Sequence, residues 1–162
     1  MDWLRWLDRL IGQVVATAQW LVLPLILLLF LQWPLRDIVH CCSLQANDIG
    51  QIFFALLVAV SVTASTRAGA HLAADTLAQH YSSRTRQRLR KLCTIIGLVP
   101  WSLFVLYASK NFVLASVFGL ESFSETDNPG YFLIKLALWI MALLIIAQGL
   151  VEIFRPLSGD DA

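Results

Sequence analysis

Long stretches without charge constrain this chain more than any other feature. Four of them cover residues 10–35, 49–66, 92–120 and 128–151. The third contains one charged residue, Lys110, and the fourth contains only Lys135. A helix needs roughly 20 mostly apolar residues to cross the hydrocarbon core of a bilayer. The sequence therefore predicts four membrane-spanning helices.

The composition of the whole chain fits this interpretation. Of its 162 residues, 58% are hydrophobic, and the segments outside the four stretches are too short to bury a core of their own. We expect an all-α integral membrane protein that forms a single domain, 1–162. Its four transmembrane helices are expected at about 13–35, 49–66, 92–118 and 129–154.

The N-terminal segment has an amphipathic pattern. Arg5 and Arg9 precede the first apolar stretch as in a signal peptide, but that stretch is too long, and we expect it to be retained as a signal anchor. Ahead of it, bulky apolar residues are interspersed with charged ones: Trp3, Leu4, Trp6, Leu7 and Leu10. This pattern predicts a short interfacial helix before the first span.

Lys and Arg are concentrated on one side of the predicted membrane. That side carries Arg5, Arg9, Arg67, Arg84, Arg86, Arg88, Arg90, Lys91 and Arg155, whereas the opposite side carries only Arg36. Because positive residues are retained in the cytoplasm, both termini and the central loop are predicted to be cytoplasmic, an N-in/C-in topology. The run from Arg84 to Lys91 lies beside a span, so we expect it to enforce topology and bind phospholipid headgroups rather than nucleic acid.

Local patterns predict where two spans begin. Asp48 followed by Gln51 resembles a capping box at the start of the second span. Asn128 and Pro129 are typical of an N-cap and a first helical residue, here opening the fourth span.

Small residues and prolines mark positions inside the spans. Ala55, Ala59 and Thr63 recur every four residues and place a small-residue strip on one face of the second span. Such strips allow close helix packing, and packing within this subunit is favoured over contact with another subunit. Pro24 and Pro100 are expected to kink the first and third spans rather than to act as gates.

Groups that mark a transport path or an enzyme are not found in the predicted spans. A coupled carrier places a carboxylate or histidine inside the bilayer, but no acid occupies the middle of a span and all three histidines lie at span ends or in loops. The three cysteines lack metal-site spacing, and no catalytic triad or phosphate loop is present. We expect no catalytic residue, cofactor or metal, so the chain is not predicted to be an enzyme. Lys110 and Lys135 are expected to snorkel toward the outer interface, with an acid of a partner as the alternative contact.

The segment after the second span carries the most specific pattern. If residues 67–75 are helical, Arg67, His71 and Asp75 share one polar face, with Gly69 between the first two. Leu72, Ala73 and Leu77 supply an apolar side. The pattern predicts a cytoplasmic connecting helix between spans 2 and 3 that lies along the inner interface.

These residues resemble a known family. An R-x-G-x-H-x-x-x-D segment after the second of four spans, with a basic stretch leading into the third, is similar to the small permease subunit of tripartite ATP-independent periplasmic (TRAP) transporters, the DctQ-like family. The resemblance rests on Arg67, Gly69, His71 and Asp75, with further support from Pro129, and covers the chain in length and topology.

The resemblance implies a role within a three-part importer in the bacterial inner membrane. A periplasmic solute-binding protein would deliver an organic acid to a large, sodium-coupled elevator subunit, and the small subunit would brace that large membrane subunit. Arg67, Gly69, His71 and Asp75 would then contact a partner. The alternatives are an accessory or assembly subunit of another membrane complex and, from a different class, a small autonomous exporter.

The predicted periplasmic loop between the third and fourth spans is acidic. It carries Glu121, Glu125 and Asp127 and contains no Lys or Arg. A negative rim of this kind steers and orients a partner with a positive patch. We therefore expect these three acids to help dock the binding protein, with an ordinary solvated loop as the equally weighted alternative.

Overall fold

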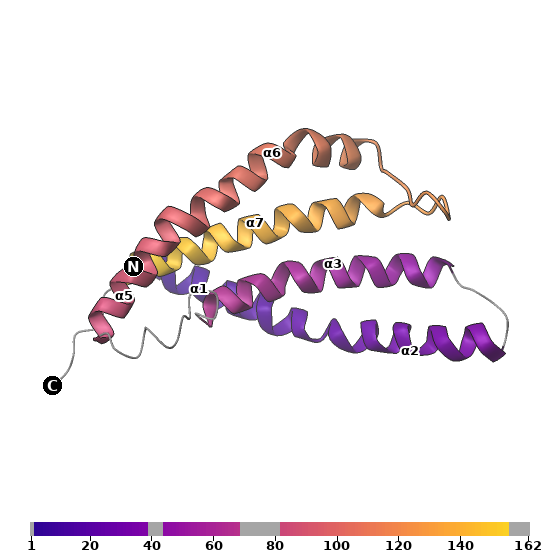
Figure 1. Ribbon diagram of the computed structural model, residues 1–162, viewed down its shortest axis with the longest axis horizontal. Helices are drawn as coiled ribbons and strands as arrows, with labels where there is room; N and C mark the ends of the chain where they lie inside the picture. Colours follow the sequence, from indigo (N-terminus) through magenta and orange to yellow (C-terminus); the bar gives the residue numbers. More distant parts are fainter. Residues whose placement is uncertain (1, 39–43, 69–81, 156–162) are drawn as a thin grey trace.

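The computed structural model describes residues 2–38, 44–68 and 82–155 (Figure 1). The elements in chain order are α1 (Asp2–Gln19), α2 (Val22–Ile38), α3 (Leu44–Arg67), α5 (Ser83–Cys93), the π-helical turn η2 (Thr94–Leu98), α6 (Val99–Phe118) and α7 (Tyr131–Phe154). Within the described residues the only β contact is an isolated bridge between Ser122 and Pro129. The predicted all-α class is confirmed.

Four helical segments are long and apolar enough to cross a membrane. They are Trp3–Gln32, Ala46–Arg67, Arg84–Phe118 and Tyr131–Phe154. The first combines α1 and α2, and the third combines α5, η2 and α6. The prediction of four transmembrane helices is therefore confirmed.

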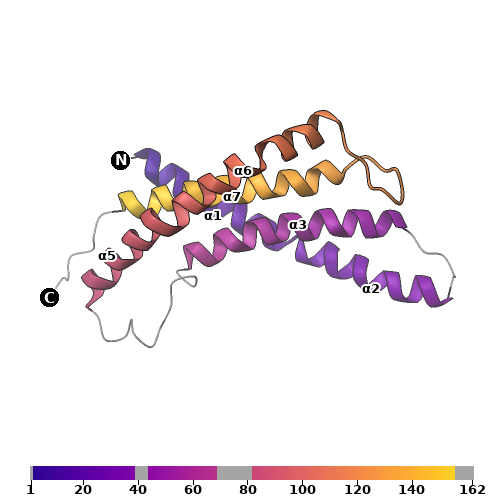
Figure 2. The same cartoon turned by 45° about the horizontal axis from the view of Figure 1, so that its top comes forward.

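The spans form an open row rather than a closed bundle. α3 has its most extensive contact with α7, α6 packs against α7, and α2 packs against α3. In the described part of the chain neither α2 nor α3 has a substantial contact with α6. The order across the row is thus α2, α3, α7 and α6, as Figure 1 shows, and after a 45° turn α2 still lies at the edge beside α3 (Figure 2). An open row leaves most side chains facing lipid or a partner.

The row has two chemically different ends. At the end that holds α1 and α5, on the left of Figure 1, lie the basic residues of α5. We call this the basic end. At the other end lies the loop 119–130 with its acidic residues, which we call the acidic end.

Pro24 and Pro100 coincide with interruptions of regular helix, whereas α2 continues through Pro34. Pro24 lies in the first turn of α2, directly after a tight turn in which Leu23 N donates to Trp20 O at 3.2 Å. Pro100 lies in the first turn of α6, directly after the π-helical turn. Because proline has no backbone N–H and crowds the preceding turn, regular α-helical hydrogen bonding stops at each site.

The N-terminal helix is longer than the sequence predicts. α1 continues without a break through Gln13 to Gln19, so the interruption falls at the turn near Trp20 rather than ahead of the first span. Its buried face, Ile11, Val15 and Ala18, packs with Val60 and Val151. Burial of this face attaches α1 to α3 and α7 at the basic end.

The two predicted caps are wrong. α3 begins at Leu44, a turn earlier than expected, so Asp48 lies inside the helix and does not cap it. The N-cap of α7 is Gly130, whose φ of 145° favours glycine, and Asn128 and Pro129 precede the helix. Asp48 and Asn128 instead bond to each other, because tertiary contacts at the acidic end outweigh local capping.

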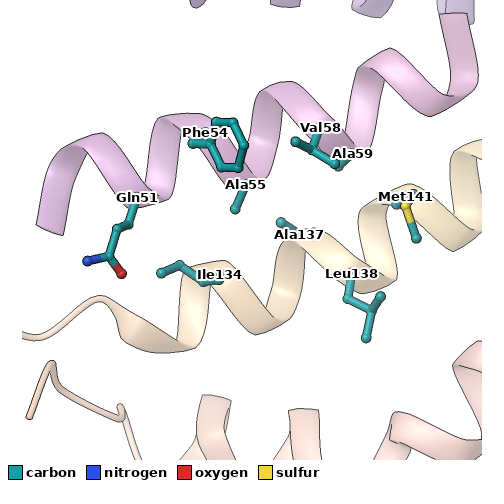
Figure 3. A pocket seen from close by; sticks show the side chains of 9 residues that line it. All are labelled: Gln51, Phe54, Ala55, Val58, Ala59, Ile134, Ala137, Leu138 and Met141. Atoms are coloured by element: carbon teal, nitrogen blue, oxygen red, sulfur yellow. The ribbon is translucent and has the colours of Figure 1, made fainter. Parts of the chain in front are cut away.

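The small-residue strip of α3 lies partly in the interior. Ala59 and Thr63 are almost fully buried within this chain, at 2% and 0% exposure. Ala55 faces Ala137 of α7 across a recess of about 390 Å³ (Figure 3). The favoured expectation, packing within the subunit, therefore describes Ala59 and Thr63. A second close approach occurs at Gly149 of α7, where an added Cβ would lie 3.0 Å from Val99 Cγ2.

Candidate interaction sites at the two ends of the helix row

Arg67 ties α3 to α1 at the basic end. Its guanidinium lies 2.9 Å from the Asp8 carboxylate and donates to the Asp8 carbonyl at 3.0 Å. The same guanidinium covers Gly12, whose added Cβ would lie 3.4 Å from Arg67 Nη2. Thus Arg67, predicted to contact a partner, has contacts inside the chain. The other residues of that prediction, Gly69, His71 and Asp75, lie outside the described residues, as does the predicted connecting helix.

Arg90 joins three helices at the same end. Its Nε lies 2.9 Å from Glu152 of α7, and its Nη2 donates at 3.3 Å to the carbonyls of Thr66 and Arg67. Those carbonyls belong to the last turn of α3, where a helix lacks internal donors. The Glu152 side chain is only 15% exposed. The Arg90 guanidinium therefore pairs with the largely buried Glu152 carboxylate and at the same time caps the C-terminal end of α3.

Lys91 satisfies the C-terminal end of α7. Its ammonium donates to the carbonyl of Ile153 at 3.0 Å and also to that of Arg155. A cation at a helix C-terminus stabilises the exposed carbonyls and complements the helix dipole. The basic run of the sequence thus divides in two: Arg90 and Lys91 connect helices, whereas the side chains of Arg84, Arg86 and Arg88 are exposed.

Asp48 ties α3 to the loop 119–130 at the acidic end. Its side chain is 6% exposed, and Oδ2 accepts from Thr126 Oγ1 at 2.5 Å and from Asn128 Nδ2 at 3.2 Å. A buried carboxylate must be hydrogen-bonded to remain charged at tolerable cost. Sequence reasoning missed this role, because the partners lie 78 and 80 residues away.

Glu121 forms the second connection at this end. Its carboxylate accepts from Lys135 Nζ of α7 and from the Ser116 hydroxyl of α6. These contacts lower the pKa of Glu121, with the hydrogen bond from Lys135 the largest cause and that from Ser116 the next. Lys135 also lies 4.0 Å from the centroid of the Phe112 ring. The loop is therefore less negative than its own sequence predicts, since α7 supplies a compensating cation.

The loop 119–130 is folded rather than extended. Phe123 N donates to Asn128 O and Asp127 N donates to Phe123 O, both at 2.9 Å. The Phe123 side chain is 6% exposed and packs edge-on against Tyr131, with ring centroids 5.4 Å apart. Glu125 and Asp127 remain exposed beside it. The acidic end thus presents a folded surface on which the two acidic residues Glu125 and Asp127 are exposed to solvent or a partner.

A polar pocket of about 420 Å³ lies on this surface. Its lining comes from the start of α3, the loop and the start of α7: Asn47, Asp48, Gln51, Glu121, Ser122, Phe123, Ser124, Glu125 and Tyr131. Gln51 also lines the apolar recess of Figure 3, where its side chain extends from α3 toward α7. Gln51 therefore borders both the polar pocket and the apolar recess.

The described residues contain no group of three His, Cys, Asp or Glu side chains that would hold a metal ion. No curated protein and no solved structure matches the chain significantly. A protein-family model does match, that of the DctQ component of tripartite ATP-independent periplasmic transporters, and it covers residues 25–159. Since that match covers most of the chain, this protein belongs to the DctQ family, the small membrane component of TRAP transporters.

Proposed function

We propose that this chain is a static scaffold that braces the large, sodium-coupled elevator subunit of a TRAP transporter and helps to dock the periplasmic binding protein during import of an organic acid. Family membership gives the three-part assembly. The scaffold role, the coupling ion, the substrate class and the docking role are the content of the proposal.

The open row of spans is the observation that carries it. In an 18-residue apolar segment of each of the four spans, only 17%, 22%, 11% and 33% is buried within the chain. A closed bundle buries a shared core, whereas a row α2–α3–α7–α6 offers broad faces on both sides. A row of this shape suits lateral contact with a larger membrane protein.

The polar contacts support a static role. At the basic end Arg67 and Arg90 tie α3 to α1, α5 and α7. At the acidic end Asp48 and Glu121 connect α3, α6 and α7 through the loop. Charges placed in this way fix the register between helices, whereas a carrier keeps a carboxylate or histidine in the membrane interior to bind its driving ion. The driving ion and the solute would therefore be bound by the large subunit.

Topology and lipid contact complete the proposal. The basic end is assigned to the cytoplasmic face of the bacterial inner membrane, with both termini inside, because Arg84, Arg86 and Arg88 are exposed there. Their side chains would bind anionic phospholipid headgroups. The acidic end is then periplasmic, and its exposed Glu125 and Asp127 would face the binding protein.

Reconstitution tests the scaffold role. Purified chain alone in liposomes is expected to take up no radiolabelled organic acid from a mixed panel. The same chain with the large subunit and the binding protein encoded beside it is expected to show uptake that depends on an inward sodium gradient. Sodium-dependent uptake by the lone chain would refute the proposal, as would full uptake by the other two subunits without it.

A further inference from the structure

One face of α6 is exposed along its whole length. Its residues recur three or four positions apart and all are exposed: Leu103, Tyr107, Lys110, Asn111, Leu114 and Phe118. We call this set the α6 stripe. The opposite face, with Ser102, Val113 and Ser116, is buried. The stripe is therefore one side of the exposed surface of α6, which also includes Trp101, Phe104 and Phe112.

Lys110 lies deep along the span. The preceding residue, Ser109, accepts a hydrogen bond from Trp139 Nε1 at 3.0 Å. Trp139 is eight residues into α7, about 12 Å from its start at Tyr131. Lys110 is also about 12 Å from the last residue of α6. Since the 20 residues of α6 are about 30 Å long, as thick as the hydrocarbon core, a membrane centred on α6 would place Lys110 within the hydrocarbon.

The Lys110 ammonium lies against the ring of Tyr107. Its Nζ lies 4.9 Å from the centroid of the Tyr107 ring, one turn toward the basic end. Helical side chains incline toward the N-terminus of their helix, and α6 begins nearer the basic end. The ammonium therefore contacts an aromatic ring of its own helix, one turn away along the chain.

Three other cations of the described chain have carboxylate partners. Lys135 has Glu121, Arg90 has Glu152, and Arg67 has Asp8. Among the described residues, Lys110 has the Tyr107 ring and no carboxylate. A lysine exposed to hydrocarbon is costly, and intramembrane charges almost always face protein or a water-filled cavity. Its neighbour Asn111, also exposed, adds a second hydrogen-bonding group to the same patch.

We propose that the α6 stripe is the face that packs against the large subunit, with Lys110 paired to a carboxylate or free backbone carbonyl on a transmembrane helix of that subunit. The proposal rests on the scaffold function above and specifies its contact. Leu103 and Leu114 supply apolar area on either side of the polar patch, while Tyr107 and Asn111 flank the ammonium. The partner helix therefore combines an apolar face with one buried acceptor.

Photocrosslinking locates the contact. A photoreactive amino acid is placed at Leu103 or Leu114 in the chain co-expressed with the large subunit, and at Leu27 of α2, which is 58% exposed, as the matched control. Adducts with the large subunit are expected from both α6 positions. Co-elution of the two proteins without an α6 adduct would overturn the inference while leaving the scaffold function intact. Failure of the unmodified proteins to co-elute would instead refute the proposed function itself.

Substitution of Lys110 tests the charge. Lys110→Leu is expected to weaken association with the large subunit roughly three- to thirty-fold, the range for interhelical polar contacts in membranes. Lys110→Arg, which keeps the charge, is expected to retain most of the association. Both variants must remain monodisperse and helical in detergent for the comparison to count.

Two other occupants of the stripe predict different results. If a lipid phosphate neutralises Lys110, Lys110→Leu leaves co-elution unchanged, because the large subunit loses nothing. If a second copy of this chain covers the stripe, crosslinking at Leu114 yields a homodimer in place of the mixed adduct. Either result would overturn the inference.

Discussion

The contact between Arg90 and Glu152 allows a quantitative test of the ties at the basic end. The two side chains are 32% and 15% exposed, with Nε and Oε1 2.9 Å apart. Removing one partner of a fully buried pair costs about 3–5 kcal/mol, and an exposed pair contributes about 0–1 kcal/mol. Since this pair is intermediate, we expect a coupling energy of about 2 kcal/mol.

The experiment is a double-mutant cycle with Arg90→Met and Glu152→Met. Unfolding of the purified chain in mixed micelles is followed by circular dichroism. Each single variant is expected to be destabilised, because it leaves one charge without its partner. The double variant should be more stable than the sum of the single effects predicts, because it removes both charges. The cycle also subtracts the loss of the Arg90 bonds to α3, which is common to both variants that lack Arg90.

A second ion pair at the basic end is the control. Arg67 and Asp8 are 32% and 31% exposed, so solvent screens their interaction more strongly than that of Arg90 with Glu152. The matching cycle with Arg67→Met and Asp8→Met should give a coupling energy below about 1 kcal/mol. Strict additivity at Arg90 and Glu152, or stronger coupling at Arg67 and Asp8, would show that burial of Glu152 does not determine the strength of the tie.

Three further predictions concern packing, pH and topology. Gly149→Val should destabilise the chain by about 1–3 kcal/mol, because the added Cβ would lie 3.0 Å from Val99 Cγ2. Gly97→Val is the control, because an added Cβ there meets open space and should not destabilise the chain. Equal effects of the two substitutions would contradict the close approach at Gly149. Because the folded-state pKa of Glu121 is below its ordinary value of 4.5, its contribution to stability is complete above that value and lost as the pH falls through the folded-state pKa; Glu121→Gln should abolish this acid sensitivity in micelle unfolding scans. For the topology test, the native cysteines are replaced and a single cysteine is introduced at the exposed Ser124 or at the exposed Thr85. The cysteine at position 124 should react with an impermeant thiol reagent in intact cells, and the one at position 85 should not. The reverse pattern would show that the topology is opposite to the one proposed.

The sequence predicts those features of the fold that depend on local composition. The bilayer requires a long apolar helix wherever the chain crosses it, so the four stretches with at most one charged residue correspond to the four spans. Proline lacks a backbone donor, and Pro24 and Pro100 coincide with interruptions of α-helix as expected, although α2 continues through Pro34. Neither inference needs knowledge of which helices are neighbours.

The predictions that failed depend on tertiary neighbours. Asp48 and Asn128 have the composition of helix caps, but each is drawn into the hydrogen-bonded contact at the acidic end. Arg90 and Lys91 belong to a basic run that we expect to contact lipid, and the structure adds contacts of both side chains with other helices that the sequence does not reveal. Pairings across such separations depend on helix order and register, which one sequence does not reveal.

The placement of the polar contacts bears on how a row of helices would perform the proposed scaffold role. α3 and α7 are connected at the basic end through Arg90 and at the acidic end through Asp48 and the loop that leads into α7. Between these connections lies the recess of about 390 Å³, lined largely by apolar side chains such as Ala55 and Ala137 (Figure 3). Lengthwise register is thus fixed by directional contacts at both ends, whereas the middle depends on non-directional packing. These contacts resist sliding of α3 against α7 along the membrane normal, which is the direction in which a moving elevator subunit would exert force. They leave the outer face of α6 free to contact that subunit, as proposed above.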